Sequence, residues 1–97
     1  MKTLDEVRET LRRHKDEVAR EYKVKELGIF GSLARGEQNR RSDIDILVEY
    51  HELPDLLKLI ELERRLQRIL KKKVDLVEKT GLRPELKESI LNEVVYV

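Results

Sequence analysis

Two aspartates one residue apart, Asp43 and Asp45, are the side chains of this sequence best suited to catalysis. Side chains alternate between the faces of a strand, so both carboxylates would project from one face, roughly 7 Å apart at Cα, and Ile44 from the other. Adjacent carboxylates repel each other and lose hydration, which a bound cation offsets. Aspartate oxygens favour hard ions, and Mg²⁺ needs only one or two carboxylates because substrate phosphates complete its shell. The pair therefore predicts a magnesium site.

A glycine-serine pair, Gly31 and Ser32, comes before these aspartates, with ten residues between Ser32 and Asp43. A strand that ends at a glycine and turns into a helix presents unpaired backbone N–H groups, where an anion is favoured. Glycine also lets a phosphate approach the backbone closely, and the serine hydroxyl is a further donor. The Gly-x-x-x-x-Gly-Lys-Ser/Thr pattern of a P-loop is missing, so metal would balance most of the phosphate charge.

Hydrophobic periodicity and turn residues locate the elements that must position these side chains. The sequence predicts α+β architecture, a small mixed sheet of three to four strands backed by helices. The apolar last four residues, 94–97, are either a final strand or part of a contact surface. The predicted elements are a helix from about Leu4 to Glu21, a strand at 24–30, a helical turn at 32–35 closed by Gly36, a loop at 37–42, a strand at 43–50, a long helix beginning at Pro54 and ending at Lys71–Lys73, a strand at 74–77, and a helix at 84–93.

Length and composition exclude several classes of protein. Ninety-seven residues predict a single domain over 1–97, and a net charge of +1 with mixed signs argues against a protein that coats a polyanion. The absence of cysteine excludes disulfides, thiolate zinc sites and cysteine nucleophiles. Apolar runs are too short for a membrane span, and basic clusters lack interleaved aromatic residues. We therefore expect a cytoplasmic protein, with neither membrane nor nucleic acid as its primary partner.

The two features together resemble a known signature. Gly31-Ser32 followed at this spacing by Asp43-Ile44-Asp45 is similar to the motif of the DNA polymerase β-like nucleotidyltransferase superfamily. Within it, the runs Phe30–Glu37 and Ser42–Val48 resemble the minimal nucleotidyltransferases, called MNT or MntA proteins. The resemblance extends from about Val24 to the C-terminus and implies a nucleotidyltransferase-like fold.

The resemblance also implies roles for individual residues. Asp43 and Asp45 would bind two Mg²⁺ ions, and Gly31 and Ser32 would bind the nucleotide. The family has a third carboxylate on a later strand, and Asp75 lies in a similar context. It would complete the second metal site and help to deprotonate an acceptor hydroxyl that attacks the α-phosphate of ATP.

Minimal nucleotidyltransferases are typically paired with a small helical HEPN protein as antitoxin and toxin. The resemblance therefore implies transfer of AMP from ATP to a tyrosine of a HEPN toxin. Two alternatives stay open: a non-catalytic antitoxin that neutralises its partner by binding, and a nucleotidyltransferase that acts on a small molecule or RNA.

Several other residues have no settled role in the sequence. Leu57 and Leu62, two further leucines of the long helix, belong either to a partner surface or to the core. Arg35 is either a phosphate contact or a structural residue. His14 is more typical of packing, and His51 follows the second strand without a predicted function.

Overall fold

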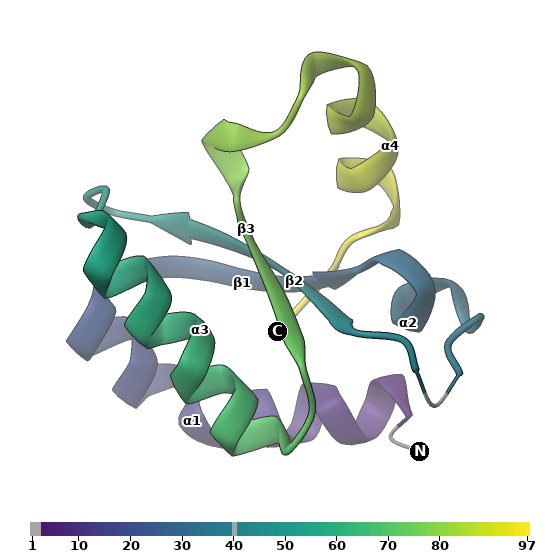
Figure 1. Cartoon of the computed structure of the whole chain (residues 1–97), viewed down its shortest axis with the longest axis horizontal. Coiled ribbons are helices and arrows are strands. Elements are labelled where there is room, and N and C mark those ends of the chain that lie inside the picture. Colours follow the sequence, from purple (N-terminus) through teal and green to yellow (C-terminus); the bar gives the residue numbers. More distant parts are fainter. Residues whose placement is uncertain (1–2, 40) are drawn as a thin grey trace.

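The four strands form one sheet, and helices pack against it (Figure 1). The computed structural model describes residues 3–39 and 41–97. The α+β class and the mixed sheet predicted from the sequence are confirmed. The elements are α1 (Leu4–Tyr22), β1 (Val24–Phe30), α2 (Gly31–Arg35), β2 (Ile44–Tyr50), α3 (Leu56–Leu70), β3 (Val74–Glu78), the 3₁₀ turn η1 (Lys79–Gly81), α4 (Pro84–Glu93) and β4 (Val95–Tyr96).

The strand order is β3-β2-β1-β4. β1 runs antiparallel to both β2 and β4, whereas β2 and β3 are parallel. The backbone N–H of Val97 donates to the Leu27 carbonyl at 2.9 Å, which continues the β1–β4 pairing to the last residue. The apolar C-terminus is therefore an edge strand, one of the two possibilities that the sequence left open.

Capping residues set the ends of the two long helices. The Thr3 side chain accepts a hydrogen bond from the Glu6 N–H at the start of α1, as its spacing predicts. α3 begins at Leu56 rather than at Pro54, which corrects the predicted start. The Asp55 side chain accepts from the Lys58 N–H at 2.9 Å, so Asp55 is the N-cap and Pro54 lies before the helix.

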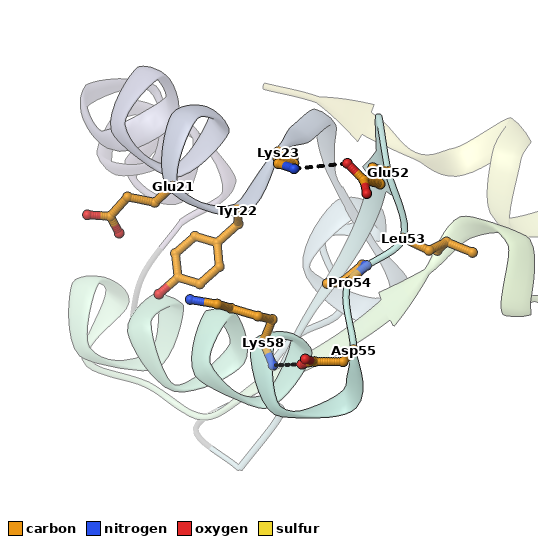
Figure 2. Close-up of a pocket in the computed structure, with 8 residues that line it drawn as sticks. All are labelled: Glu21, Tyr22, Lys23, Glu52, Leu53, Pro54, Asp55 and Lys58. Atoms are coloured by element: carbon orange, nitrogen blue, oxygen red, sulfur yellow. Dashed lines mark hydrogen bonds and ion pairs between the residues drawn. The ribbon is translucent and has the colours of Figure 1, made fainter.

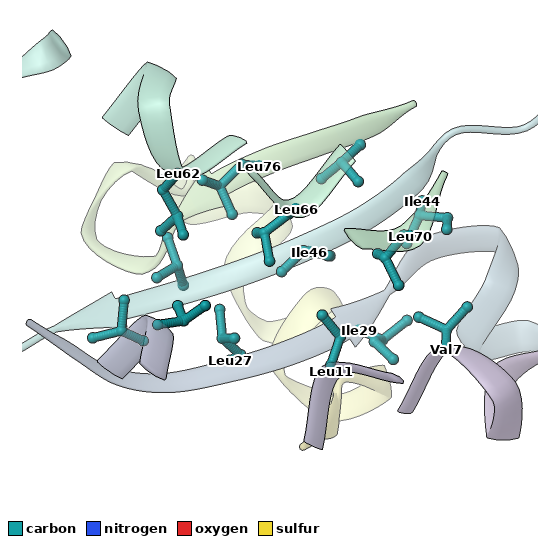
Figure 3. Close-up of a cluster of buried hydrophobic side chains, with 14 of the residues drawn as sticks. Val7, Leu11, Leu27, Ile29, Ile44, Ile46, Leu62, Leu66, Leu70 and Leu76 are labelled. Atoms are coloured by element: carbon teal, nitrogen blue, oxygen red, sulfur yellow. The ribbon is translucent and has the colours of Figure 1, made fainter. Parts of the chain in front are cut away.

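The hydrophobic core lies between α1, α3 and one face of the sheet (Figure 3). Leu62 is fully buried in this core, so it is not available to a partner. Leu57 is 74% exposed and lies outside the core. The largest fully buried side chains are Leu11, Leu27, Ile29, Ile44, Ile46, Leu47, Leu62, Leu66 and Leu70.

α4 stands apart from α1 and α3 and connects β3 to the opposite edge of the sheet (Figure 1). It contacts α2, the short helix between β1 and β2. None of the residues of α4 is fully buried. Across residues 3–39 and 41–97, no helix combines the length and apolar content of a membrane span.

Candidate active site

Asp45 lies on the sheet face that points away from α1 and α3. Its neighbours Ile44 and Ile46 are fully buried in the core, and Asp45 between them is only half-buried on the other face. Asp45 pairs in register with Phe30 of β1 and with Asp75 of β3. Paired residues on neighbouring strands project from the same face, about 5 Å apart. The register therefore places Asp75 beside Asp45.

Asp43 lies just before β2, which begins at Ile44 rather than at the predicted residue 43, and its charge reaches Asp45. The Ile44 N–H donates to the Lys73 carbonyl at 2.9 Å, so the pairing of the two strands already holds the chain next to Asp43. Burial, followed by the charges of Asp75 and Asp43, raises the pKa of Asp45 to about 6. Asp43 and Asp75 thus both lie within electrostatic range of Asp45.

Gly31 lies directly against the Asp45 carboxylate. Its φ is +73°, in the left-handed region that favours glycine. A Cβ at this position would overlap the carboxylate, coming within 2.9 Å of its Cγ atom. The glycine is therefore required by both backbone conformation and space, and the two sequence features come together at the end of β1.

Ser32 follows Gly31 within α2 and is half-buried. Its carbonyl accepts from the Glu37 N–H at 2.8 Å, and Gly36 ends the helix in the left-handed region, as the sequence predicts. This closure fixes the backbone of the Gly31-Ser32 turn beside Asp45.

Glu93, the last residue of α4, is the part of the site that sequence reasoning missed. Its carboxylate accepts from the Gly31 N–H at 3.0 Å, and the Arg35 guanidinium donates to it at 3.1 Å. Arg35 also pairs with Glu37 at 2.9 Å. No local pattern marks Glu93, because it is separated from Gly31 by 62 positions and ends an ordinary amphipathic helix.

The two histidines lie away from the aspartates. His51 follows β2 at the end opposite Asp45, where its N–H donates to the Lys23 carbonyl. His14 is half-buried on α1, which packs on the other face of the sheet. Neither histidine joins the acidic cluster.

Side chains of α3 hold the strand that carries Asp75. Gln67 accepts from the Val74 N–H and Glu63 from the Leu76 N–H, each at 3.1 Å. β3 is an edge strand, and these two acceptors satisfy N–H groups beside Asp75 that would otherwise be open.

Replacing both acceptors, Glu63→Ala with Gln67→Ala, is expected to lower the free energy of unfolding by about 2 kcal/mol, since each lost hydrogen bond costs about 1 kcal/mol. Hydrogen exchange at the Val74 and Leu76 amides should accelerate. Glu61→Ala is the matched control, because Glu61 lies on the same helix and pairs with Lys58 of that helix. Unchanged exchange at both amides in the double variant would contradict this role.

The carboxylates fit a hard divalent cation by their donor chemistry. Over the described ranges, no three His, Cys, Asp or Glu side chains form a group that could hold a metal ion as they stand. The protein thus offers less than a full coordination cage. Mg²⁺ accepts such a site, because it usually keeps several waters and takes substrate phosphates as ligands.

A cavity of about 280 Å³ lies at the other end of the sheet (Figure 2). Tyr22 and Lys58 project into it from α1 and α3, and Lys23 pairs with Glu52 at its rim. None of the three aspartates lines it. We place the reaction centre at the aspartates instead, because the cavity brings together neither paired carboxylates nor a close-approach glycine.

Comparisons with known proteins show the family of this chain. The model of the nucleotidyltransferase domain family matches residues 11–97. The protein adenylyltransferase MntA of Thermococcus cleftensis is 47% identical, over all of this chain and 98% of its own length. A solved structure provisionally described as a minimal nucleotidyltransferase is 37% identical, with a TM-score of 0.73, and the match covers 90% of this chain and 92% of that one.

A second solved structure, described as a toxin-antitoxin with AMP-PNP, is 28% identical with a TM-score of 0.72. The match covers 87% of this chain and 69% of that one. The family model spans Gly31, Ser32 and all three aspartates. The chain therefore belongs to the nucleotidyltransferase domain family, among its minimal members, and is an enzyme.

Proposed function

We propose that this enzyme transfers AMP from ATP, with Mg²⁺, to a tyrosine hydroxyl of a HEPN toxin, and so acts as its antitoxin. The observation that carries the proposal is the convergence of Asp45, Asp75 and Gly31. Carboxylates crowded beside a Gly-Ser turn suit a metal-bound triphosphate. The name of the Thermococcus relative, a protein adenylyltransferase, supports a protein as acceptor.

Each group has a defined task in this reaction. Asp43 and Asp45 hold the cation, which when bound neutralises phosphate charge and stabilises the attacking and leaving oxygens. Gly31 lets the backbone turn lie directly against the Asp45 carboxylate, and Ser32 adds a hydroxyl donor. Asp75 is exposed, so an acceptor from another protein can reach it.

The acceptor oxygen forms a bond to the α-phosphorus, and the bond from this phosphorus to the oxygen that bridges to the β-phosphate breaks. Pyrophosphate leaves, and the hydroxyl proton passes to the Asp75 carboxylate. The protein contributes position and charge rather than covalent chemistry.

A protein partner is supported by the apolar surface of the chain. Leu53, Leu56 and Leu57, at the start of α3, are each more than 60% exposed. The relative described as a toxin-antitoxin with AMP-PNP combines a partner with a nucleotide. In this chain, recognition of the acceptor would then come from contacts with the partner.

The test is to incubate the purified chain with ATP, Mg²⁺ and the product of its neighbouring gene, and then to measure the intact mass of that product. A gain of one or more AMP units, mapped to a tyrosine and lost with Asp43→Asn plus Asp45→Asn, is expected. The variant with both substitutions is the control for contaminating transferases.

Neutralisation that survives these substitutions without any mass gain would contradict the proposal and favour an antitoxin that acts by binding. Transfer to RNA or a small molecule, with the partner unmodified, would assign a different acceptor. Omission of Mg²⁺, with EDTA present, should abolish the mass gain.

A further inference from the structure

Arg35 is held between two carboxylates that come from different parts of the chain. Its guanidinium pairs with Glu37, two residues away, and with Glu93 at the end of α4. Glu93 bridges two donors, the Arg35 guanidinium and the Gly31 N–H. The Glu93 carboxylate thus already engages both the Arg35 guanidinium and the Gly31 N–H.

The surroundings of Glu93 are strongly acidic. The charge of Arg35 lowers the pKa of Asp45 and the charge of Glu93 raises it, so both side chains lie within electrostatic range of Asp45. The Glu93 side chain is 23% exposed, against 64% for Glu37, so its charge is less screened by water. Arg35 and the Gly31 N–H are therefore donors that a second anion near Asp45 would also seek.

We infer that Glu93 is an internal anion, which engages Arg35 and the Gly31 N–H in the free enzyme and gives them up when the polyphosphate of the nucleotide binds. This inference rests on the proposed function and on Arg35 as a phosphate contact, one of the two roles that the sequence left open. Guanidinium groups pair with phosphate oxygens in two parallel hydrogen bonds, which suits a triphosphate beside the aspartates.

The place of Glu93 in the fold allows such an exchange. It ends α4, which contacts α2 and has no fully buried residue. Segments with few buried contacts open at low cost. When the phosphates take Arg35, repulsion between them and Glu93 favours movement of the end of α4 away from α2.

A different role for Glu93, as a further metal ligand, predicts the opposite result. If Glu93 competes with phosphate, removal of its charge strengthens nucleotide binding. If Glu93 holds a cation, removal of its charge weakens binding. The sign of one change in affinity therefore separates the two roles.

The test measures binding of a non-hydrolysable ATP analogue and of inorganic tripolyphosphate, each with Mg²⁺, by isothermal titration calorimetry. Glu93→Gln keeps an oxygen that can accept from the Gly31 N–H but removes the charge. We expect it to tighten both ligands about three- to tenfold, the range of a partly exposed ion pair. Arg35→Gln should weaken both by about tenfold or more.

Glu37→Gln is the matched control, because Glu37 pairs with the same guanidinium but does not contact Gly31. Its expected change is less than about twofold, as for an exposed pair. Hydrogen exchange at the Gly31 amide supplies a second readout: it should change on nucleotide binding in the wild type. Denaturant unfolding of each variant shows that it is folded.

Weaker binding in Glu93→Gln, or unchanged binding in Arg35→Gln, would overturn this inference and leave the proposed function standing. A wild-type chain that binds neither ligand with Mg²⁺ would overturn both. Equal effects of Glu37→Gln and Glu93→Gln would show a general charge effect and also overturn the inference.

Discussion

The Asp45→Asn variant is expected to lose nucleotidyl transfer by at least about 100-fold and yet to be more stable than the wild type in Mg²⁺-free buffer at neutral pH. In the proposed mechanism Asp45 is a direct metal ligand, and its loss should exceed the roughly 10- to 100-fold cost of losing a group that only supports a ligand. The stability gain follows from the pKa of Asp45, which is about 6 against an ordinary value of 3.8.

The sign of this effect depends on pH. Because the folded state binds the Asp45 proton more tightly than the unfolded state, this group favours folding below about pH 4, and that contribution is lost as the pH rises to about 6. Above that range the charged carboxylate is destabilising. Asp45 is half-exposed, so solvent screening reduces the expected gain in the asparagine variant to about 1–2 kcal/mol.

Urea unfolding at several pH values, with EDTA, measures this difference. The gap between the asparagine variant and the wild type should close as the pH approaches 4. Added Mg²⁺ should reduce the difference in free energy of unfolding at neutral pH, because it stabilises only the wild type. An Asp45→Asn variant that is less stable than the wild type throughout would contradict the crowding of charges described for this site.

The second large effect is expected from Gly31→Ala, which should abolish transfer and lower the free energy of unfolding by about 2 kcal/mol or more. An alanine at φ +73° costs about 1–2 kcal/mol, and its Cβ would in addition overlap the Asp45 carboxylate. The displaced carboxylate would then no longer meet a metal ion in its original position.

Gly36→Ala is the control for the cost of the backbone conformation, since Gly36 also has φ +73° but has open space where an added Cβ would lie. It should lose about 1–2 kcal/mol and keep most of its activity. Adding Asp45→Ala to Gly31→Ala should recover part of the lost stability without recovering transfer. Equal losses of activity in the two glycine variants would show that the overlap with Asp45 is unimportant.

The sequence allowed the strands and the local geometry of the site to be predicted. Glycine after an apolar run predicted the turn at Gly31, and alternation in β2 predicted opposite faces for Ile44 and Asp45. These inferences succeeded because they depend on neighbours in the chain. The catalytic and metal-binding roles of these residues stay predictions.

Contacts between distant segments were beyond such reasoning. The pairing of Asp45 with Asp75 depends on the parallel register of β2 and β3, and was reached only through the family resemblance. Glu93 was missed because its place depends on the return of α4 to α2. Leu57 and Leu62 share a leucine-rich helix, and only the packed structure separates the exposed one from the buried one.

The account depends most on a cation and a triphosphate meeting at Asp43, Asp45 and Gly31. A crystal of the chain grown with Mn²⁺ in place of Mg²⁺ and a non-hydrolysable ATP analogue tests this directly, through the anomalous scattering of manganese. We predict a manganese peak in contact with Asp43 and Asp45, and phosphate density against Gly31. Manganese and nucleotide located in the cavity between Tyr22 and Lys58, with the aspartates uncoordinated, would contradict it.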